Sequence, residues 1–239
     1  LPEVVDADAK QLIVTDRGLI EAGVVDQVTA VLDSTGIPYC VFDGVGANPL
    51  AKNAHAGARQ YIKEDCRGLI AVGGGSPMDV AKMVGILATN GGRIESYLGA
   101  GKVGTDLPPL ICVPTTYGTG SEVTQFSVLT NPKTSNKDPI ISWKIVPQMG
   151  ILDADLAVAL PASVGGPTGM DALTHAIESY TNLLSTPITE GIAISAIELI
   201  AASIRTACAN DHETEATQDM LIASAMAGIA FSNSMVGLV

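Results

Sequence analysis

Two side chains that could bind a metal stand four residues apart in the 239-residue sequence, namely Asp171 and His175. On a helix, residues at this spacing are neighbours on one face, one turn apart. A carboxylate oxygen and an imidazole nitrogen suit a divalent first-row metal such as iron or zinc. These two residues, here called the metal pair, therefore predict a metal-binding helix face, although the same spacing also fits two ordinary polar residues on a helix.

A run of three glycines indicates a second kind of site. Val-Gly-Gly-Gly-Ser-Pro-Met-Asp at 72–79, here called the glycine loop, follows a predicted strand and opens a predicted helix. Ser76 suits the N-cap of that helix, Pro77 its first position and Asp79 a capping box. Glycine lets the backbone approach a ligand, and amides at a helix start attract phosphate. The segment predicts phosphate binding, with a tight turn as the alternative, and its spacing departs from the usual G-x-G-x-x-G.

A second polar segment, Pro-Thr-Thr-Tyr-Gly-Thr-Gly-Ser-Glu at 114–122, is here called the threonine loop. Its hydroxyl groups can donate and accept hydrogen bonds, and its two glycines again permit close approach. Alone it would be an ordinary polar turn. Because it leaves the strand after the one that precedes the glycine loop, we expect both loops to line one cofactor cleft at the same edge of a parallel sheet.

Strands and helices must alternate to position these loops. The predicted elements are strands at 11–15, 38–42, 68–72, 110–113, 126–130 and 140–146, and helices at 17–34, 49–66 and 77–89. Apolar strands alternating with helices predict an α/β fold, a Rossmann-like parallel sheet with helices on both faces. We therefore expect a dinucleotide-binding domain at 1–160.

The pattern changes after about Leu160, where the segment 161–167 contains two prolines and no strand-like run follows. Helical periodicity covers 168–180, 187–209 and 213–239, which predicts that 161–239 is the beginning of an all-α domain. Because proline breaks a helix, the helix with the metal pair is expected to start at Thr168.

The composition and net charge limit the classes of partner that the chain is expected to bind. Hydrophobic residues make up 47% and charged residues 16%, which is typical of a globular chain, and the formal charge of −12 argues against a nucleic-acid partner. The longest apolar run, 192–204, is interrupted by polar residues, so no membrane span is predicted. The four cysteines are far apart in the sequence, which predicts reduced thiols in a cytoplasmic protein.

The ends of the sequence favour truncation. There is no initiator methionine, and the last residues at 231–239 run out inside an apolar stretch without a helix stop. We expect a chain truncated at both ends, and the apolar end at 230–239 favours a homodimer or larger homo-oligomer.

Together these motifs resemble the iron-dependent (group III) alcohol dehydrogenase family. The resemblance is carried by 73–79, 114–116 with 118–122, Ile-Leu-Asp-Ala-Asp at 151–155, Gly-Met-Asp-Ala-Leu-Thr-His-Ala at 169–176 and Phe-Ser-Asn at 231–233. It implies a dehydroquinate synthase-like architecture, with a metal in the cleft between an α/β and a helical domain. It also implies interconversion of a short-chain primary alcohol or diol and its aldehyde by hydride transfer.

The resemblance further implies Fe²⁺, or sometimes Zn²⁺, held by one aspartate and three histidines. Asp171 and His175 match the first two ligands. The other two histidines, and a catalytic histidine near them, would lie beyond Val239. His55 and His212 do not match these positions and are expected to be surface histidines.

The family's cofactor contacts can be transferred residue by residue. Gly74, Gly75 and Ser76 should meet the pyrophosphate, and Thr115 and Thr116 the adenine and ribose. The other cofactor positions are Asn48, Asp79 and Lys137, with Lys144 as an alternative to Lys137. Asp16 ends the first strand, where a carboxylate can accept from ribose hydroxyls and repel a 2′-phosphate, so NAD is favoured over NADP. Asp16 could otherwise be a simple turn residue.

Three other interpretations remain open at this point. The protein could be a zinc-dependent polyol dehydrogenase of the glycerol type, or a part of a fused aldehyde–alcohol dehydrogenase. If the 239 residues are the whole molecule, it could also be a nucleotide-binding module without turnover.

Overall fold

The computed structural model describes residues 6, 8–132, 134–209 and 213–236. Its contacts divide the chain into two compact units, the first made of Leu1–Val113 and Gln125–Gly150, the second of Pro114–Thr124 and Ile151–Val239. The threonine loop therefore belongs to the second unit, although it stands in the sequence between strands of the first. The functional domains expected at 1–160 and 161–239 stay predictions.

A five-stranded sheet forms the centre of the first unit, in the order β2-β1-β3-β5-β8. The strands are β1 (Gln11–Val14), β2 (Tyr39–Phe42), β3 (Gly68–Gly73), β5 (Leu110–Pro114) and β8 (Met149–Gly150). The pairs β1–β2, β1–β3 and β5–β8 are parallel, which confirms the predicted parallel sheet, although β8 itself was not predicted. All residues of β1 and β3 are buried, because helices cover the sheet on both faces and exclude water.

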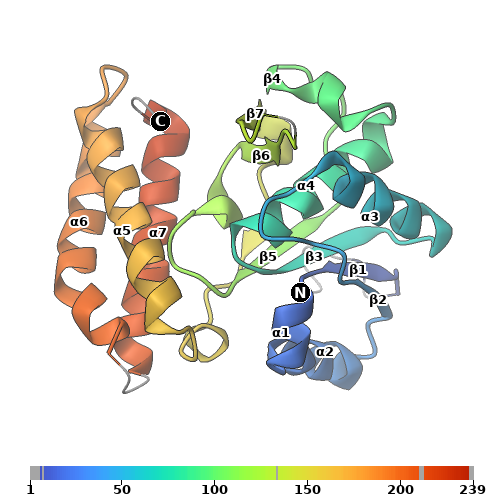
Figure 1. The fold of residues 1–239 in the computed structure, drawn as a ribbon, viewed down its shortest axis with the longest axis horizontal. Helices are drawn as coiled ribbons and strands as arrows, with labels where there is room; N and C mark the ends of the chain where they lie inside the picture. The colour runs from blue at the N-terminus through green and yellow to red at the C-terminus, as the bar shows by residue number, and fades with distance from the viewer. Residues whose placement is uncertain (1–5, 7, 133, 210–212, 237–239) are drawn as a thin grey trace. The chain divides into compact units, whose positions relative to one another are not determined.

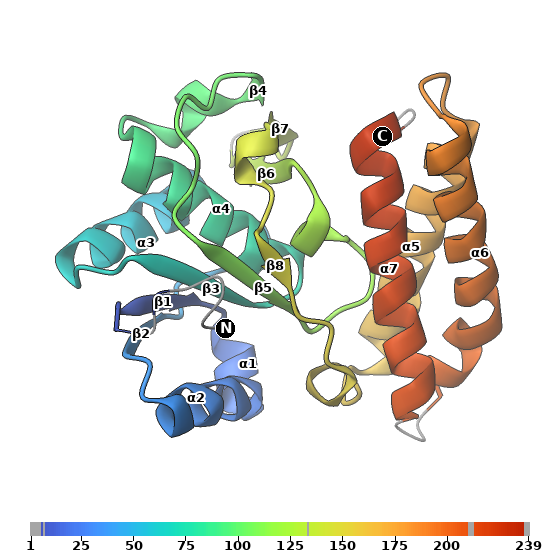
Figure 2. The same cartoon turned by 180° about the vertical axis from the view of Figure 1, so that it is seen from behind.

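Two pairs of helices cover this sheet, α1 (Arg17–Glu21) and α2 (Val24–Thr35) on one face, α3 (Ala51–Lys63) and α4 (Gly75–Asn90) on the other (Figures 1 and 2). The single helix predicted at 17–34 is therefore wrong. Gly23 adopts a left-handed conformation with φ 74°, which an α-helix cannot contain, and the chain starts α2 anew.

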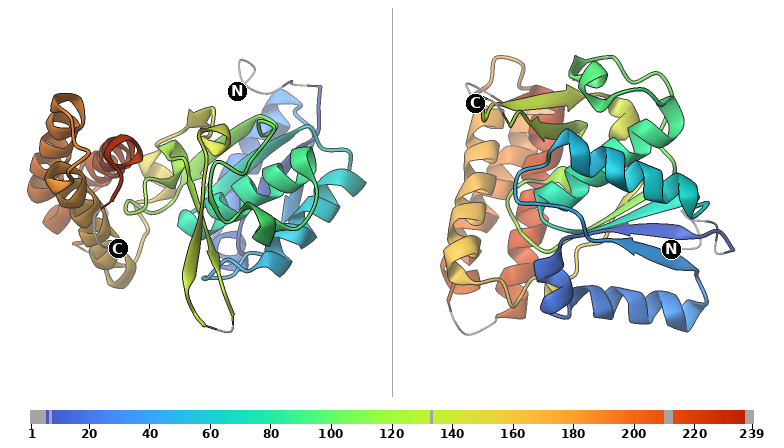
Figure 3. Two further views of the ribbon diagram at one scale, coloured as in Figure 1. Left: turned by 90° about the horizontal axis from the view of Figure 1, so that it is seen from above. Right: turned by 45° about the vertical axis from the view of Figure 1, so that its right-hand side comes forward.

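A smaller sheet in the same unit consists of β4 (Gly99–Ala100), β7 (Lys137–Ile141) and β6 (Phe126–Thr130), with β6 and β7 antiparallel (Figure 3). The strand expected at 140–146 ends at Ile141, since Trp143–Ile145 forms a 3-10 turn capped by Ser142. The buried amine of Lys82 on α4 donates to the Phe126 carbonyl at 2.7 Å, which joins α4 to the hairpin.

Three helices form most of the second unit, α5 (Ala162–Thr181), α6 (Pro187–Ala207) and α7 (Thr214–Ser234). Small residues dominate their contacts, such as the fully buried Ala172, Ala176 and Ala196. The buried hydroxyls of Ser179 on α5 and Ser234 on α7 lie 2.8 Å apart. Among the residues that the structure describes, α6 is the one helix that is long and apolar enough to cross a membrane. One such helix is weak evidence, and the predicted absence of a membrane partner stays a prediction.

The predicted start of α5 at Thr168 is wrong, because the helix begins at Ala162 and runs through Gly165, Gly166 and Pro167. Pro167 lacks the amide that would bond to the carbonyl four residues earlier. The neighbouring carbonyls keep partners, since the Thr168 hydroxyl donates to Val164 at 3.0 Å and to Gly165 at 3.2 Å. Packing against the rest of the unit stabilises the helix across Pro167, because most of the stability of a helix in a protein comes from tertiary contacts.

Candidate functional site

Asp171 and His175 lie on the same face of α5, as predicted. Asp171 Oδ1 and His175 Nε2 are 3.8 Å apart, and both side chains are partly exposed. The other ring nitrogen, Nδ1, lies 3.2 Å from the Gly118 carbonyl oxygen of the threonine loop. Because a carbonyl can only accept, Nδ1 donates this hydrogen bond, and Nε2 is the ring nitrogen on the side of Asp171. An imidazole whose Nδ1–H is held by a carbonyl is oriented to bind a metal through Nε2.

The His175 ring is also held by packing against Phe231 on α7. The two ring centroids are 4.6 Å apart and the planes are tilted by 43°, a favourable arrangement for aromatic rings. The hydrogen bond to Gly118 fixes one end of the imidazole and the Phe231 ring supports its side. Three separate segments of the second unit thus determine where Nε2 points.

Glycines bring the threonine loop against α5 and α7. A Cβ at Gly118 would lie 2.6 Å from the Thr168 carbonyl oxygen, and one at Gly120 would lie 2.8 Å from Gly228 Cα on α7. Gly120 also has φ 60°, which side chains other than glycine rarely adopt. The loop carbonyl that fixes His175 therefore depends on positions where no Cβ fits. Thr115 in this loop is buried and Thr116 is half-buried.

Glu178 is a further polar residue on the face of α5 that carries Asp171 and His175. It follows His175 by three residues and Asp171 by seven, and both spacings place side chains on one helix face. Its Oε2 is buried and has no hydrogen-bond partner among the described residues. Helical spacing was a signal that could have singled it out. A buried carboxylate oxygen without a partner is a group that a cation or a donor would stabilise.

Asp171 and His175 alone would not complete a metal site. Within the described ranges, no group of three or more His, Cys, Asp or Glu side chains is placed to bind an ion. One carboxylate and one imidazole fit the ligand preferences of Fe²⁺ or Zn²⁺, so the donors that are present suit the metal that the resemblance implies. The location of the remaining ligands and of a catalytic histidine stays a prediction.

The glycine loop ends β3 and begins α4, but its capping differs from the prediction. Gly74 is the N-cap of α4 and no described side chain caps it, whereas Ser76 lies inside the first turn and donates its hydroxyl to the Ala47 carbonyl at 3.0 Å. Gly73 has φ 146°, and a Cβ there would lie 2.5 Å from Pro77 Cγ. The turn therefore occurs earlier than expected, since glycine alone permits this backbone path. Gly74, Gly75, Ser76 and Asp79 are all half-buried.

The other predicted cofactor residues have the following surroundings. Asp16 is the N-cap of α1, because its Oδ1 accepts from the Leu19 amide at 3.1 Å. Asn48 and Lys137 are exposed. The alternative Lys144 pairs with Asp106 at 3.0 Å. Their contacts with a cofactor stay predictions.

The sequence contains two histidines besides His175, and both were expected to be surface residues. His55 belongs to the first unit and is partly exposed, and its Nε2 accepts from the Ile94 amide at 3.5 Å. His212 lies outside the described residues.

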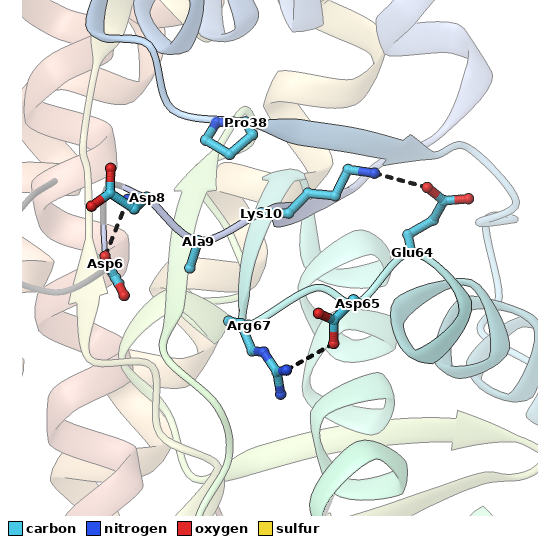
Figure 4. Close-up of a pocket in the computed structure, with 8 residues that line it drawn as sticks. All are labelled: Asp6, Asp8, Ala9, Lys10, Pro38, Glu64, Asp65 and Arg67. Carbon is cyan, nitrogen blue, oxygen red and sulfur yellow. Dashed lines mark hydrogen bonds and ion pairs between the residues drawn. The ribbon is translucent and has the colours of Figure 1, made fainter.

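A charged depression lies where β1, β2 and β3 begin (Figure 4). Its lining residues are Asp6, Asp8, Ala9, Lys10, Pro38, Glu64, Asp65 and Arg67. The Lys10 amine and Glu64 carboxylate are 2.8 Å apart, and hydrogen bonding to Lys10 lowers the pKa of Glu64. Arg67 likewise pairs with Asp65 at 2.8 Å. The glycine loop follows β3 at its other end, so none of the predicted cofactor residues lines this depression.

Two family models match the chain. The one described as iron-containing alcohol dehydrogenase matches residues 1–154, and the one described as Fe-containing alcohol dehydrogenase family, C-terminal, matches residues 167–239. These matches include both the glycine loop and the Asp171–His175 pair.

Known proteins are similar over almost the whole chain. The 1,3-propanediol dehydrogenase of Citrobacter freundii is 45% identical over 96% of this chain and 60% of its own length. The NAD-dependent methanol dehydrogenase of Bacillus methanolicus is 40% identical over the same shares. A crystal structure of a 1,3-propanediol oxidoreductase superposes with a TM-score of 0.92 at 42% identity, covering 96% of this chain and 60% of that one. The chain thus spans about three fifths of the length of these relatives.

A parallel α/β sheet unit and a helical unit define the dehydroquinate synthase-like architecture, and the predicted fold class is confirmed. Within that class, the chain belongs to the iron-containing alcohol dehydrogenase family, a family of oxidoreductases. The resemblance noted from the sequence is therefore confirmed.

Proposed function

We propose that this protein takes part in the NAD-dependent interconversion of a short-chain primary alcohol or diol and its aldehyde. The observation that supports this most directly is the His175 geometry: Nδ1 donates to Gly118, which leaves Nε2 available beside Asp171. The printed names of the relatives, which include 1,3-propanediol and methanol dehydrogenases, support the substrate class. We further propose a cytoplasmic homodimer or larger homo-oligomer.

In this proposal, Asp171 and His175 hold an Fe²⁺ ion, with Zn²⁺ as the alternative. A bound divalent ion lowers the pKa of an alcohol, and NAD⁺ accepts the hydride. The hydrogen bond to Gly118 orients the His175 ring so that Nε2 lies on the side of Asp171, and Glu178 places a buried carboxyl oxygen on the same helix face. The helix that carries these groups belongs to the metal-binding domain proposed at 161–239.

The dinucleotide is proposed to bind to the domain at 1–160. Gly74, Gly75 and Ser76 lie at the start of α4, where backbone amides and the helix dipole attract a pyrophosphate. Since no described side chain caps this helix end, those amides face no competing carboxylate or hydroxyl acceptor from a capping residue. Asp79, Asn48 and Lys137 are proposed to complete the contacts, with Thr115 and Thr116 at the adenine and ribose.

The test is an assay of NADH formation by the protein at its natural length, reconstituted without oxygen with Fe²⁺ or with Zn²⁺. We expect turnover of 1,3-propanediol and other short primary alcohols with Fe²⁺ and NAD⁺, and little without metal. Metal content measured beside activity separates the iron enzyme from a zinc enzyme. Tight NAD⁺ binding without turnover of any alcohol in the panel would contradict the proposal and favour a nucleotide-binding module.

Asp16 gives a separate prediction about the choice of cofactor. Asp16→Asn removes the negative charge but keeps an oxygen able to cap α1, because asparagine is as good an N-cap as aspartate. If the Asp16 charge repels a 2′-phosphate in the wild type, its removal should raise kcat/KM for NADP⁺ relative to kcat/KM for NAD⁺ by about tenfold, which corresponds to about 1.4 kcal/mol. Asp26→Asn, which removes the same charge from an exposed position on α2, is the control and should leave the ratio unchanged. An unchanged ratio in both variants would make Asp16 a capping residue only.

A further inference from the structure

Two thiols of the first unit lie in contact. The Sγ atoms of Cys40 on β2 and Cys66, which stands between α3 and β3, are 3.5 Å apart. Cys40 is half-buried and Cys66 is 3% exposed. The sequence separates them by 26 residues, so no local motif announces the pair. Neither thiol belongs to the glycine loop or the metal pair.

Hydrogen bonds hold the backbone on both sides of the pair. Cys40 lies opposite Leu12 in the parallel pairing of β1 and β2. On the other side of β1, the Arg67 amide donates to the Lys10 carbonyl at 2.8 Å, immediately after Cys66. β1 therefore fixes the two cysteine-bearing segments relative to each other, and the closeness of the thiols is a property of the sheet.

The turn before Cys66 directs its side chain inward. Asp65 has φ 51°, a left-handed conformation that ends α3, and the Cys66 amide donates to the Tyr61 carbonyl at 3.0 Å. This is the hydrogen bond of a Schellman motif, which reverses the chain at a helix end. The motif places the Cys66 thiol in the core beside α3, against the partly buried Cys40.

A disulfide bond requires only a small movement from this arrangement. Its S–S length is about 2.05 Å, so the sulfurs must approach by about 1.5 Å, which side-chain rotation can supply. Small oxidants can reach Cys40, because this residue is partly exposed.

We propose that Cys40 and Cys66 form a peroxide-responsive dithiol site that closes to a disulfide. The Cys40 thiolate attacks one oxygen of hydrogen peroxide, the O–O bond breaks, and the departing hydroxide takes a proton to become water. The Cys66 sulfur then attacks the sulfur of the Cys40 sulfenic acid, the S–O bond breaks, and the oxygen leaves as a second water with the Cys66 proton. Two thiols lose two electrons in total, and one peroxide is reduced to two waters.

The surroundings assign the order of these steps. The pKa of Cys66 is raised to about 12, mainly by burial and secondly by the hydrogen bond with Cys40, so Cys66 stays protonated at neutral pH. Cys40 is the more accessible of the two thiols, so peroxide reaches it first, and its thiolate is the nucleophile of that step. Cys66 reacts second and gives up its proton to the departing oxygen while its sulfur, 3.5 Å from that of Cys40, attacks the sulfenic acid. The site is independent of the proposed dehydrogenase function.

The test uses the protein at its natural length, treated with hydrogen peroxide, alkylated, digested and mapped by mass spectrometry. We expect a cross-linked peptide joining Cys40 to Cys66, loss of two alkylatable thiols, and full recovery with dithiothreitol. Cys40→Ser should abolish the cross-link and leave Cys66 alkylatable. The matched control, Cys208→Ser, removes a half-buried thiol of the second unit, 3.8 Å from the Tyr117 hydroxyl, and should leave the cross-link intact.

The wild-type peptide map decides the outcome even if Cys40→Ser does not fold. Cys40 and Cys66 that both remain alkylatable at a peroxide dose that consumes Cys208 would overturn the proposal. Oxidation of Cys40 to a sulfinic acid without a cross-link would do the same, because it would show that Cys66 cannot reach the sulfenic acid.

Discussion

His175→Ala is expected to lower the affinity for Fe²⁺ by more than about a hundredfold. Loss of a residue that only supports a metal ligand already lowers metal affinity by about 10–100-fold, and loss of a ligand should lower it further. The variant loses one of the two proposed ligands, the imidazole nitrogen, and keeps the Asp171 carboxylate. Turnover with any alcohol should fall with the metal content. Metal analysis after dialysis, beside anaerobic titration with Fe²⁺, measures the effect.

His55→Ala is the matched control for this experiment. It removes a second imidazole, which lies in the first unit and accepts from the Ile94 amide. Its iron content and turnover should stay at the level of the wild type. Retention of stoichiometric iron by His175→Ala, with an unchanged circular dichroism spectrum, would refute the assignment of the metal pair.

Gly118→Ala is expected to reduce both stability and metal affinity. The new Cβ would lie 2.6 Å from the Thr168 carbonyl oxygen and 2.9 Å from Thr168 Cβ, so the threonine loop must move away from α5. Overpacking of this kind costs about 1–3 kcal/mol in unfolding free energy. The Gly118 carbonyl that fixes His175 moves with the loop, which should weaken metal binding by about 10–100-fold. Urea unfolding and metal titration measure the two effects separately.

Gly191→Ala tests whether Gly118 is special or whether any added methyl group in the helical unit is harmful. Gly191 is a helical position on α6 where a Cβ would meet no atom within 4 Å. Alanine there should stabilise the protein by about 0.5–1 kcal/mol, because glycine is a poor helix former, and should leave the metal affinity unchanged. If Gly118→Ala lost stability but kept wild-type metal affinity, the carbonyl contact would have no role in positioning His175.

The sequence predicted those features that depend on neighbouring residues. The apolar runs of β1, β3 and β5 identified the strands because these strands are buried on both faces. The spacing of Asp171 and His175 placed them on one face because helix geometry is local. The two-residue strand β8 escaped notice, since a pair of residues has no periodicity.

Features that depend on distant contacts could not be predicted. His175 contacts Gly118 and Phe231, which are both far from it in the sequence. A glycine and a phenylalanine carry no sequence signal that would indicate these contacts. The expected break of α5 at Pro167 failed because Gly165 packs against the buried Tyr117 hydroxyl, where a Cβ would collide, and the helix continues through the proline. Local propensity was overruled there by packing.

The capping of α4 shows a different limit. Ser76 has the right residue type for an N-cap and Pro77 for a first helical position, but each stands two residues too late in the chain for that role. The backbone turns at Gly73 instead, with a φ that only glycine adopts readily. When several consecutive residues can end a strand, sequence preferences identify the turn but not its register.

The contacts that His175 makes with the threonine loop and with α7 determine when, during synthesis of the chain, its side chain can be oriented. His175 is fixed by a carbonyl 57 residues before it and by an aromatic ring on α7, which leaves the ribosome later than α5. Domains fold from the N-terminus as they emerge, and closing such long loops precedes the contacts that reward it. The metal pair is therefore oriented only once α7 has been made, so iron would be acquired after translation of this helix rather than by the nascent α5.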